Sequence, residues 1–146
     1  MKNVFRAAVV GLLGLGSPAF AGVFTDDLSR CLVDKTTSED KTTLVRWIFV
    51  AMTQHPSVSS LTNVTAKDVQ AHNQKTGALF MRLLTESCVD EAKKAIKTEG
   101  AVAIQASFQV LGQAAVGELF VHPDVNKVMA GLDQFLDAKK LEALAQ

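Results

Sequence analysis

The sequence has no tyrosine, only three prolines and one tryptophan among its 146 residues, while alanine is abundant. This composition favours helix over strand. Basic residues are not gathered either, because no block is longer than Lys93 with Lys94 or Lys139 with Lys140. Nucleic-acid affinity comes mainly from neutralising several phosphates, and a polybasic surface is likewise needed to hold anionic lipid. The scattered charge therefore argues against both kinds of partner.

Catalytic and metal-binding motifs are also missing. The sequence has no G-x-S-x-G, no H-E-x-x-H and no glycine-rich phosphate loop. Adjacent carboxylates occur at Asp26 with Asp27, where a helix start explains them. The three histidines offer only Met52 and His55 at i, i+3, which falls short of the three or four ligands of a zinc or copper site. We expect no catalytic residue, no metal, no cofactor and a non-enzymatic protein.

The first residues have the organisation of an export signal. Lys2 and Arg6 give a positive start, residues 7–15 are apolar or glycine, and Ala19 and Ala21 supply the small side chains that precede a cleavage site. The apolar run is shorter than the ~20 residues that span a bilayer. We therefore expect residues 1–21 to be a secretory signal peptide, the protein to be periplasmic or secreted, and no membrane anchor to remain after cleavage.

The part that remains, residues 22–146, has the length of a single domain. Its 125 residues can bury about two-thirds of their unfolded surface, which is enough for a core without a metal. Loss of Lys2 and Arg6 leaves 13 basic against 15 acidic residues, a formal charge of −2. We expect one helical domain over this range.

Two cysteines remain in that domain, Cys31 and Cys88. In an oxidising compartment an even pair is typically bonded, and closing a loop of this length restricts the unfolded chain by about 4 kcal/mol in the entropy model. The alternative, a redox pair, usually has C-x-x-C spacing. The pair predicts one structural disulfide.

Helix signals recur along the chain and predict an all-α bundle of about five to six helices. Thr37 with Asp40 and Thr65 with Asp68 have capping-box spacing. Pro56 ends one helix, and Gly100 is placed to close another as a left-handed cap. The expected helices cover residues 25–35, 39–54, 66–85, 88–98, 101–121 and 124–136, followed by a weakly packed helical tail.

The core is predicted from the apolar faces of these helices. Residues 44–52 are apolar except Arg46, and a helix that is apolar nearly all round belongs at the centre of a bundle. We expect Trp47, Ile48 and Met52 to be core residues. The inward faces of the third and last helices are expected to carry Val69, Thr76, Phe80, Leu83 and Leu84, and Val125, Val128, Met129, Leu132 and Leu136.

Residues 101–121 carry a single charge, Glu118, and a stripe of amides four residues apart, Gln105, Gln109 and Gln113. Placing three amide side chains in lipid without hydrogen-bond partners costs free energy, so we expect this segment to be a buried helix of a bundle and not a membrane span. A freely solvated face normally carries Lys and Glu, and loss of charge is typical of the centre of an interface. The stripe therefore predicts either contact with another subunit or partner protein, or pairing within the chain.

The motif H-P-x-V occurs twice, starting at His55 and at His122. Each copy follows an apolar helix that lies downstream of a cysteine helix, which is compatible with a decayed duplication. The simpler interpretation is local, since His suits a helix C-terminus and Pro suits the first position of the next helix.

The segments CLV at 31–33, LVRWIF at 44–49 and HP at 55–56 resemble small exported bacterial helical proteins of unknown function. The resemblance covers about the first half of the exported part and implies no activity. In layout the chain is similar to periplasmic acid-stress chaperones and to antitoxin-like immunity proteins, which combine a signal peptide, a helical bundle and one disulfide.

Two functions are compatible with these features. The first is a protein-binding module, acting as inhibitor, immunity factor, adaptor or chaperone on another protein or on a second copy. The alternative is a carrier of a small apolar ligand, because the aromatic residues could line a cavity in a helical bundle. These residues are Trp47, Phe49, Phe80, Phe108 and Phe120.

Overall fold

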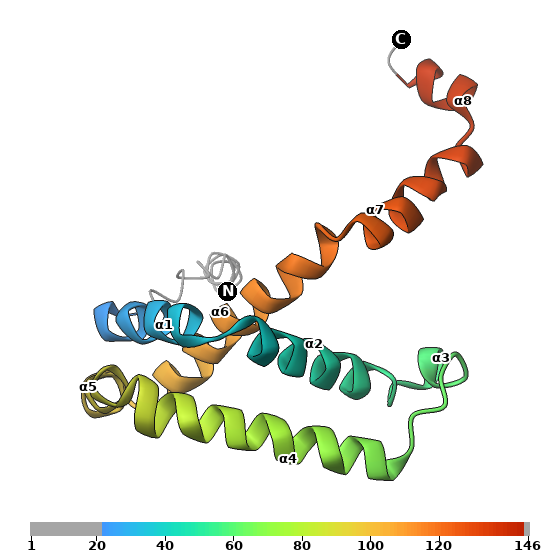
Figure 1. Ribbon diagram of the computed structural model, residues 1–146. Helices are drawn as coiled ribbons and strands as arrows, with labels where there is room; N and C mark the ends of the chain where they lie inside the picture. Colours follow the sequence, from blue (N-terminus) through green and yellow to red (C-terminus); the bar gives the residue numbers. More distant parts are fainter. Residues whose placement is uncertain (1–21, 145–146) are drawn as a thin grey trace, which may run out of the picture.

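Helix is the only regular secondary structure in residues 22–144, the part of the chain that the computed structural model describes (Figure 1). The predicted all-α class is confirmed. The expected signal peptide, residues 1–21, lies outside the described residues. The α-helices are α1 Val23–Lys35, α2 Ser38–Met52, α3 Pro56–Ser59, α4 Ala66–Arg82, α5 Val89–Glu99, α6 Ala101–Phe120, α7 Pro123–Ala130 and α8 Ala138–Ala143, with a π-helical turn η1 Leu83–Ser87 and a 3-10 turn η2 Gly131–Phe135.

The helix starts reflect local chemistry. Both predicted capping boxes form: Thr37 accepts from the N–H of Asp40 while the Asp40 carboxylate accepts from that of Thr37, and Thr65 and Asp68 do the same at α4. Such reciprocal bonds satisfy amides that have no partner within the helix. At the other end of α5, Gly100 has φ +81° and ψ −172°, so its φ is positive as expected but its ψ is extended.

The core lies where α1 meets α5, α6 and the end of α4. Helix α6 buries one residue in four along a single face, and most of these side chains are small, which lets α1 approach closely. The buried hydroxyl of Ser107 donates to the carbonyl of Thr25 at 3.1 Å. The core residues are Leu28, Leu32, Leu44, Leu79, Leu83, Cys88, Ala92, Ala95, Ala103, Leu111 and Ala115.

Helix α2 is not central, which corrects one prediction. It packs against α4 along its length and against α6 near its start, and it fully buries only Leu44 and Val50 (Figure 1). Trp47 and Ile48 are half-buried, and Met52 is 62% exposed. The apolar run was misleading because only one side of this helix meets the core.

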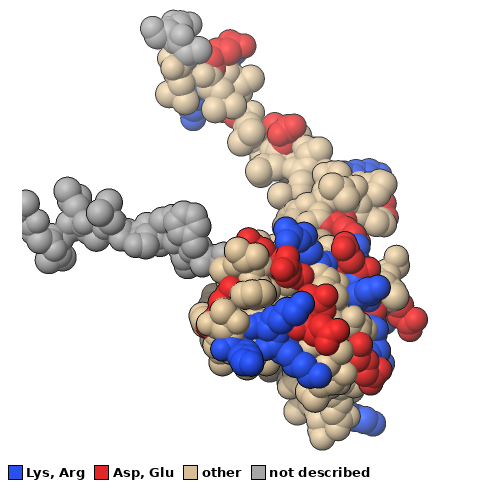
Figure 2. Space-filling model, turned by 90° about the vertical axis from the view of Figure 1, so that its left-hand side faces the viewer, with Lys and Arg blue, Asp and Glu red and all other residues tan. Residues whose placement is uncertain are grey.

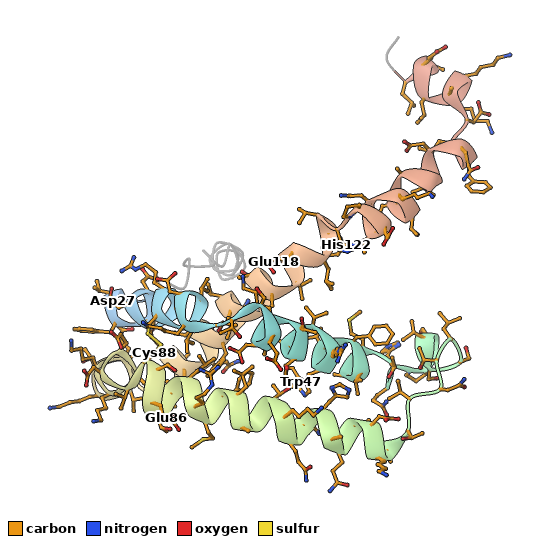
Figure 3. The ribbon with its side chains drawn as sticks, in the orientation of Figure 1. Asp27, Trp47, Glu86, Cys88, Glu118 and His122 are labelled. Carbon is orange, nitrogen blue, oxygen red and sulfur yellow. A yellow bond between two sulfur atoms is a disulfide. The ribbon has the colours of Figure 1, made fainter. Side chains whose placement is uncertain are left out.

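Trp47 lies between α2 and α4 (Figure 3). Its indole N–H donates to Asn73 Oδ1 at 2.8 Å, and its ring meets Phe80 edge-on with centroids 6.0 Å apart. Phe80 in turn packs on Phe108 of α6 with centroids 4.1 Å apart. This aromatic row joins the α2–α4 pair to α6. The predicted inward face of α4 is right, since Thr76 and Leu83 are buried and Phe80 is half-buried.

The predicted disulfide between Cys31 and Cys88 is present, with the two Cα atoms 5.9 Å apart. It joins α1 to the junction of α4 and α5, where Cys88 is fully buried (Figure 3). The turn before it is π-helical: the N–H of Cys88 donates to the carbonyl of Leu83, five residues earlier, at 2.8 Å.

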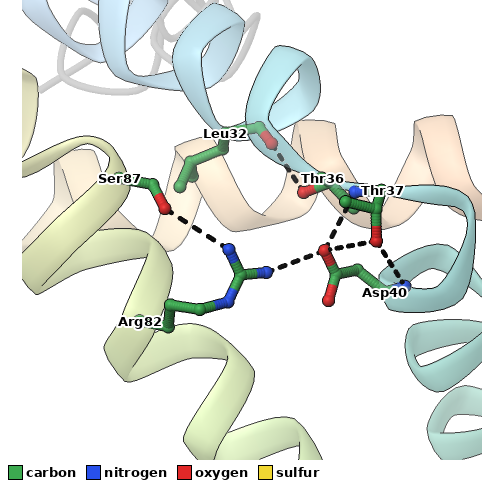
Figure 4. A network of polar contacts seen from close by, with 6 residues as sticks. All are labelled: Leu32, Thr36, Thr37, Asp40, Arg82 and Ser87. Carbon is green, nitrogen blue, oxygen red and sulfur yellow. Dashed lines mark hydrogen bonds and ion pairs between the residues drawn. The ribbon is translucent and has the colours of Figure 1, made fainter.

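An ion pair ties the start of α2 to the end of α4 (Figure 4). Arg82 donates to Asp40 at 2.7 Å and to the hydroxyl of Ser87 at 3.4 Å. Partial burial raises the pKa of Asp40, but hydrogen bonds from Thr37 and the charge of Arg82 outweigh it and hold that pKa below its ordinary value. Asp40 therefore serves as cap and ion-pair partner together.

Candidate functional site

The C-terminal part of the chain leaves the core at a His-Pro turn. Helix α6 ends at Phe120, and His122 then starts α7 by accepting the N–H of Asp124 on its Nδ1 at 3.3 Å, with Pro123 at the first helical position. Proline fits that position because its missing N–H would have no partner there. We call residues 121–144 the C-terminal arm; in Figure 1 they extend away from α1–α5.

The two H-P-x-V motifs adopt the same local structure. His55 accepts the N–H of Ser57 on Nδ1 at 3.2 Å, and its φ and ψ, −73° and 131°, nearly equal the −66° and 132° of His122. Each imidazole caps the helix after it, whereas the sequence interpretation had placed it at the end of the helix before. After α3 the chain returns along α2, whereas after α7 the described residues, up to 144, do not return to the body.

The arm exposes the side chains that were expected to face inward. The prediction was wrong because the only extensive contacts of α7 within the described residues are with α6 and with η2, so no other helix covers its apolar face. Val125 is half-buried. Eight large apolar side chains of the arm are at least half exposed: Val121, Val128, Met129, Leu132, Phe135, Leu136, Leu141 and Leu144.

Charged side chains occur on both parts of the molecule. Lys, Arg, Asp and Glu cover much of the body on the face seen in Figure 2, and on the arm they lie scattered among uncharged residues. The arm carries three lysines and four carboxylates, so it has no excess of positive charge; these residues are Lys127, Lys139, Lys140, Asp124, Asp133, Asp137 and Glu142.

The predicted amide stripe, Gln105, Gln109 and Gln113, is exposed on α6. Each amide lies two positions from a buried residue such as Ser107 or Leu111, which places it about 200° around the helix, on the side away from the core. The three side chains make no hydrogen bond within residues 22–144, so pairing inside the described chain is not observed.

A shallow apolar groove lies beside this stripe, between α2 and α6, close to the root of the arm. Gln113 is its one polar residue, which brings the stripe and the groove together. The groove is lined by Ile48, Gly112, Gln113, Val116, Gly117 and Phe120.

A second pocket, of about 390 Å³, opens between α2 and α4. Its walls are mainly apolar: Val45, Phe49, Val50, Val64 and Leu119, with Arg46, Asp68 and His72 as polar residues. The Nδ1 atom of His72 is buried and has no hydrogen-bond partner among the described residues. Asp68, which lies four residues before His72 on α4, borders the same pocket, and the hydroxyl and N–H of Thr65 lower the pKa of its carboxyl group.

The aromatic residues do not line one common cavity. Phe49 borders the α2–α4 pocket and Phe120 the α2–α6 groove, while Phe80 and Phe108 pack on each other. Residues 22–144 contain no group of three or more His, Cys, Asp or Glu side chains that could hold a metal ion. In the same range no helix has both the length and the apolar character needed to cross a membrane.

The chain matches no protein-family model, no curated protein and no solved structure. Its function must therefore be inferred from its own surfaces, of which the arm, the amide stripe and the two apolar hollows are the most distinctive. The amide stripe and the weakly packed helical tail could be found in the sequence, but the exposure of residues 121–136 was missed. Pro123 could not have indicated it, because the same His-Pro motif at Pro56 is followed by a return of the chain along α2.

Proposed function

We propose that this protein is a non-enzymatic, exported protein-binding module, an inhibitor, immunity factor, adaptor or chaperone, and that the C-terminal arm is its main contact element. The observation that carries the proposal is the apolar face of the arm. Eight large apolar side chains in a segment of 24 residues are each 50–83% exposed. Contiguous exposed apolar surface of this kind is uncommon on monomeric proteins and marks sites of protein–protein contact.

A protein suits this surface better than a lipid bilayer does. Amphipathic helices that lie on membranes usually combine an apolar face with many basic residues, which are attracted to anionic lipid. The three lysines of the arm are outnumbered by its four carboxylates. The α2–α6 groove and the amide stripe extend the exposed apolar surface onto the body with residues that carry no charge, as the centre of an interface would require.

Export is the second part of the proposal. It is supported by the signal-like residues 1–21 and by the Cys31–Cys88 bridge, since disulfides persist in oxidising compartments. A periplasmic or secreted protein of this kind would meet its partner outside the cytoplasm.

The test compares two charge substitutions at equally exposed apolar positions. Phe135, in the arm, is 79% exposed, and Leu61, in the loop before α4, is 77% exposed. Neither Phe135→Glu nor Leu61→Glu should change the melting temperature much, because neither removes buried packing. Cross-linking in the native host, followed by mass spectrometry, should give a specific cross-linked product of the wild-type protein with its partner. This product should be absent with Phe135→Glu and present with Leu61→Glu.

Sedimentation of the purified proteins distinguishes self-association from a different partner. If the product is a second copy, the wild-type protein sediments as a larger species and Phe135→Glu as a monomer. Gln109→Glu examines the α6 stripe in the same way, because a charge buried against a partner costs several kcal/mol while an exposed one costs little. Identical products and sedimentation for wild type and Phe135→Glu would refute the arm as the contact element.

Carriage of a small apolar ligand is the second candidate, supported by the α2–α4 pocket. Its volume falls within the range of ligand sites, and the unpartnered His72 Nδ1 offers one polar contact among apolar walls. Calorimetric titration with dodecanoate should show binding that Phe49→Ala weakens and Leu61→Ala does not. Absence of measurable heat with the wild-type protein at millimolar dodecanoate would remove this candidate.

A further inference from the structure

The carboxylate of Glu99, at the end of α5, lies at the start of α1. Its Oε1 accepts the N–H of Phe24 at 3.0 Å, and its Oε2 accepts the N–H of Thr25 at 2.9 Å and the Thr25 hydroxyl at 2.5 Å. The residue at the cap position itself, Gly22, has no side chain to offer. A residue some 75 positions away thus performs the task that a Ser, Thr, Asp or Asn normally performs locally.

Glycine at position 22 leaves the space that Glu99 occupies. A Cβ built on Gly22 would lie 2.1 Å from Glu99 Oε1 and 2.6 Å from Oε2, closer than real Cβ contacts allow. Standard geometry separates a backbone nitrogen from the Cβ position by about 2.5 Å, so the nitrogen of Gly22 lies within about 4.6 Å of Glu99 Oε1. The carboxylate is therefore close enough to stabilise a positive charge at that nitrogen.

We propose that Gly22 is the first residue of the mature protein and that Glu99 is the binding site for its α-ammonium group. Hydrolysis of the Ala21–Gly22 peptide bond by a signal peptidase consumes one water, leaves Ala21 as a carboxylate and gives Gly22 an amine, which is protonated to an ammonium with three hydrogens. This group forms an ion pair with the carboxylate that already caps α1. The inference depends on the predicted cleavage position and is independent of the proposed partner binding.

The ion pair would offset an unfavourable electrostatic effect of cleavage on α1. A positive charge at a helix N-terminus is opposed by the helix dipole, so a free ammonium directly before α1 would destabilise it. The hydroxyl of Thr25, together with the N–H groups of Phe24 and Thr25, lowers the pKa of Glu99, so the site holds a full negative charge at neutral pH. Asp27 opposes that lowering, and its negative charge also favours an ammonium nearby.

The experiment starts with the exported protein. Intact mass should show an N-terminus at Gly22; an N-terminus elsewhere overturns the proposal. In the mature protein, NMR titration should then give an α-amine pKa above the usual value of about 7.7–8.0. Glu99→Gln should lower the proton affinity of that amine about tenfold, the effect expected when an opposite charge a few ångströms away is lost.

A matched comparison separates the ammonium site from simple helix capping. A chain that keeps Ala21 has no charge at Gly22, so Glu99→Gln should lower its melting temperature less than it lowers that of the mature chain. Equal losses, or an unchanged amine titration, mean that Glu99 only caps Phe24 and Thr25 and overturn the inference.

If Glu99→Gln does not fold, N-terminal acetylation of the mature wild-type protein provides the same test without a substitution. Acetylation removes the ammonium charge and leaves every side chain unchanged. If the ammonium were only opposed by the helix dipole, its removal would make the acetylated protein more stable than the unmodified one. If the ammonium is paired with Glu99, its removal makes the acetylated protein less stable. A melting temperature that rises or stays the same therefore overturns the proposal.

Discussion

Replacing Cys31 and Cys88 together with alanine is expected to lower the free energy of unfolding by about 4 kcal/mol. The bridge joins residues 57 positions apart, and the chain-entropy relation assigns about 4 kcal/mol at 25 °C to closing a loop of that length in the unfolded chain. Cys88 is fully buried, so the missing sulfur adds a smaller packing loss. For a domain of this size the change corresponds to about 12–20 °C in melting temperature.

Equilibrium unfolding in urea measures this change directly, monitored by the fluorescence of Trp47. The single tryptophan lies between α2 and α4, against Phe80, so its signal should report loss of tertiary packing. The slope of the transition should also rise slightly in the variant, because an unfolded chain without the bridge exposes more surface.

Wild-type protein unfolded in the presence of a reductant is the matched control, and it should behave like the double variant. The single variant Cys31→Ala should do the same, since it removes the bridge and keeps the buried thiol of Cys88. A loss below about 1 kcal/mol, or a reduced wild type as stable as the oxidised one, would refute loop closure as the main contribution of this bridge.

Three further substitutions test local features. Gly100→Ala should lower the free energy of unfolding by about 1–3 kcal/mol, because a φ of +81° with an extended ψ strains an L-residue even in open space. The control Gly112→Ala, inside α6, should not destabilise the protein. Equal urea midpoints for the two variants would contradict this. Trp47→Phe should lower the free energy of unfolding by about 1 kcal/mol, because it removes the hydrogen bond to Asn73. Truncating a fully buried tryptophan costs about 3–5 kcal/mol, so a loss of that size would mean that Trp47 is more deeply buried. Asp40→Asn should flatten the acid side of the stability profile. Because the pKa of Asp40 is lowered in the folded protein, the stability that its charge contributes is complete above the unfolded pKa near 3.8 and is lost as the pH falls through the folded pKa. Parallel profiles of unfolding free energy for wild type and variant from pH 7 to pH 2 would contradict this assignment.

Features encoded by neighbouring residues could be predicted from the sequence. The capping boxes at Thr37 and Thr65 depend on a side chain three positions away, and both form. The Cys31–Cys88 bridge joins distant residues, but it could be expected because a chain with only two cysteines has one possible pairing. The inward face of α4 agrees with helical periodicity, because that helix has α2 beside it along its length.

Periodicity could not predict whether an apolar face has a partner. The same pattern places Leu83 in the core and leaves Leu132 60% exposed, because α4 is packed and the arm is not. Met52 was misplaced for a related reason, since it lies on the side of α2 that faces away from α4, while Val50 and Thr53 beside it are buried. Glu99 could not be found either, because its partner at α1 is brought to it only by the fold.

The π-helical turn between α4 and α5 makes this region sensitive to chain length. It inserts one residue into the helical repeat, and each residue rotates the downstream helix by about 100°. Deletion of a single residue between Leu83 and Ser87 would therefore give a more regular helix and yet turn Cys88 away from Cys31 and the buried face of α5 away from α1. Substitutions on the exposed side of this turn should be tolerated in evolution and in mutational scans, whereas single-residue insertions and deletions there should not. A deletion scan would thus show a narrow intolerant window in a stretch where most side-chain changes at Thr85 and Glu86 are neutral.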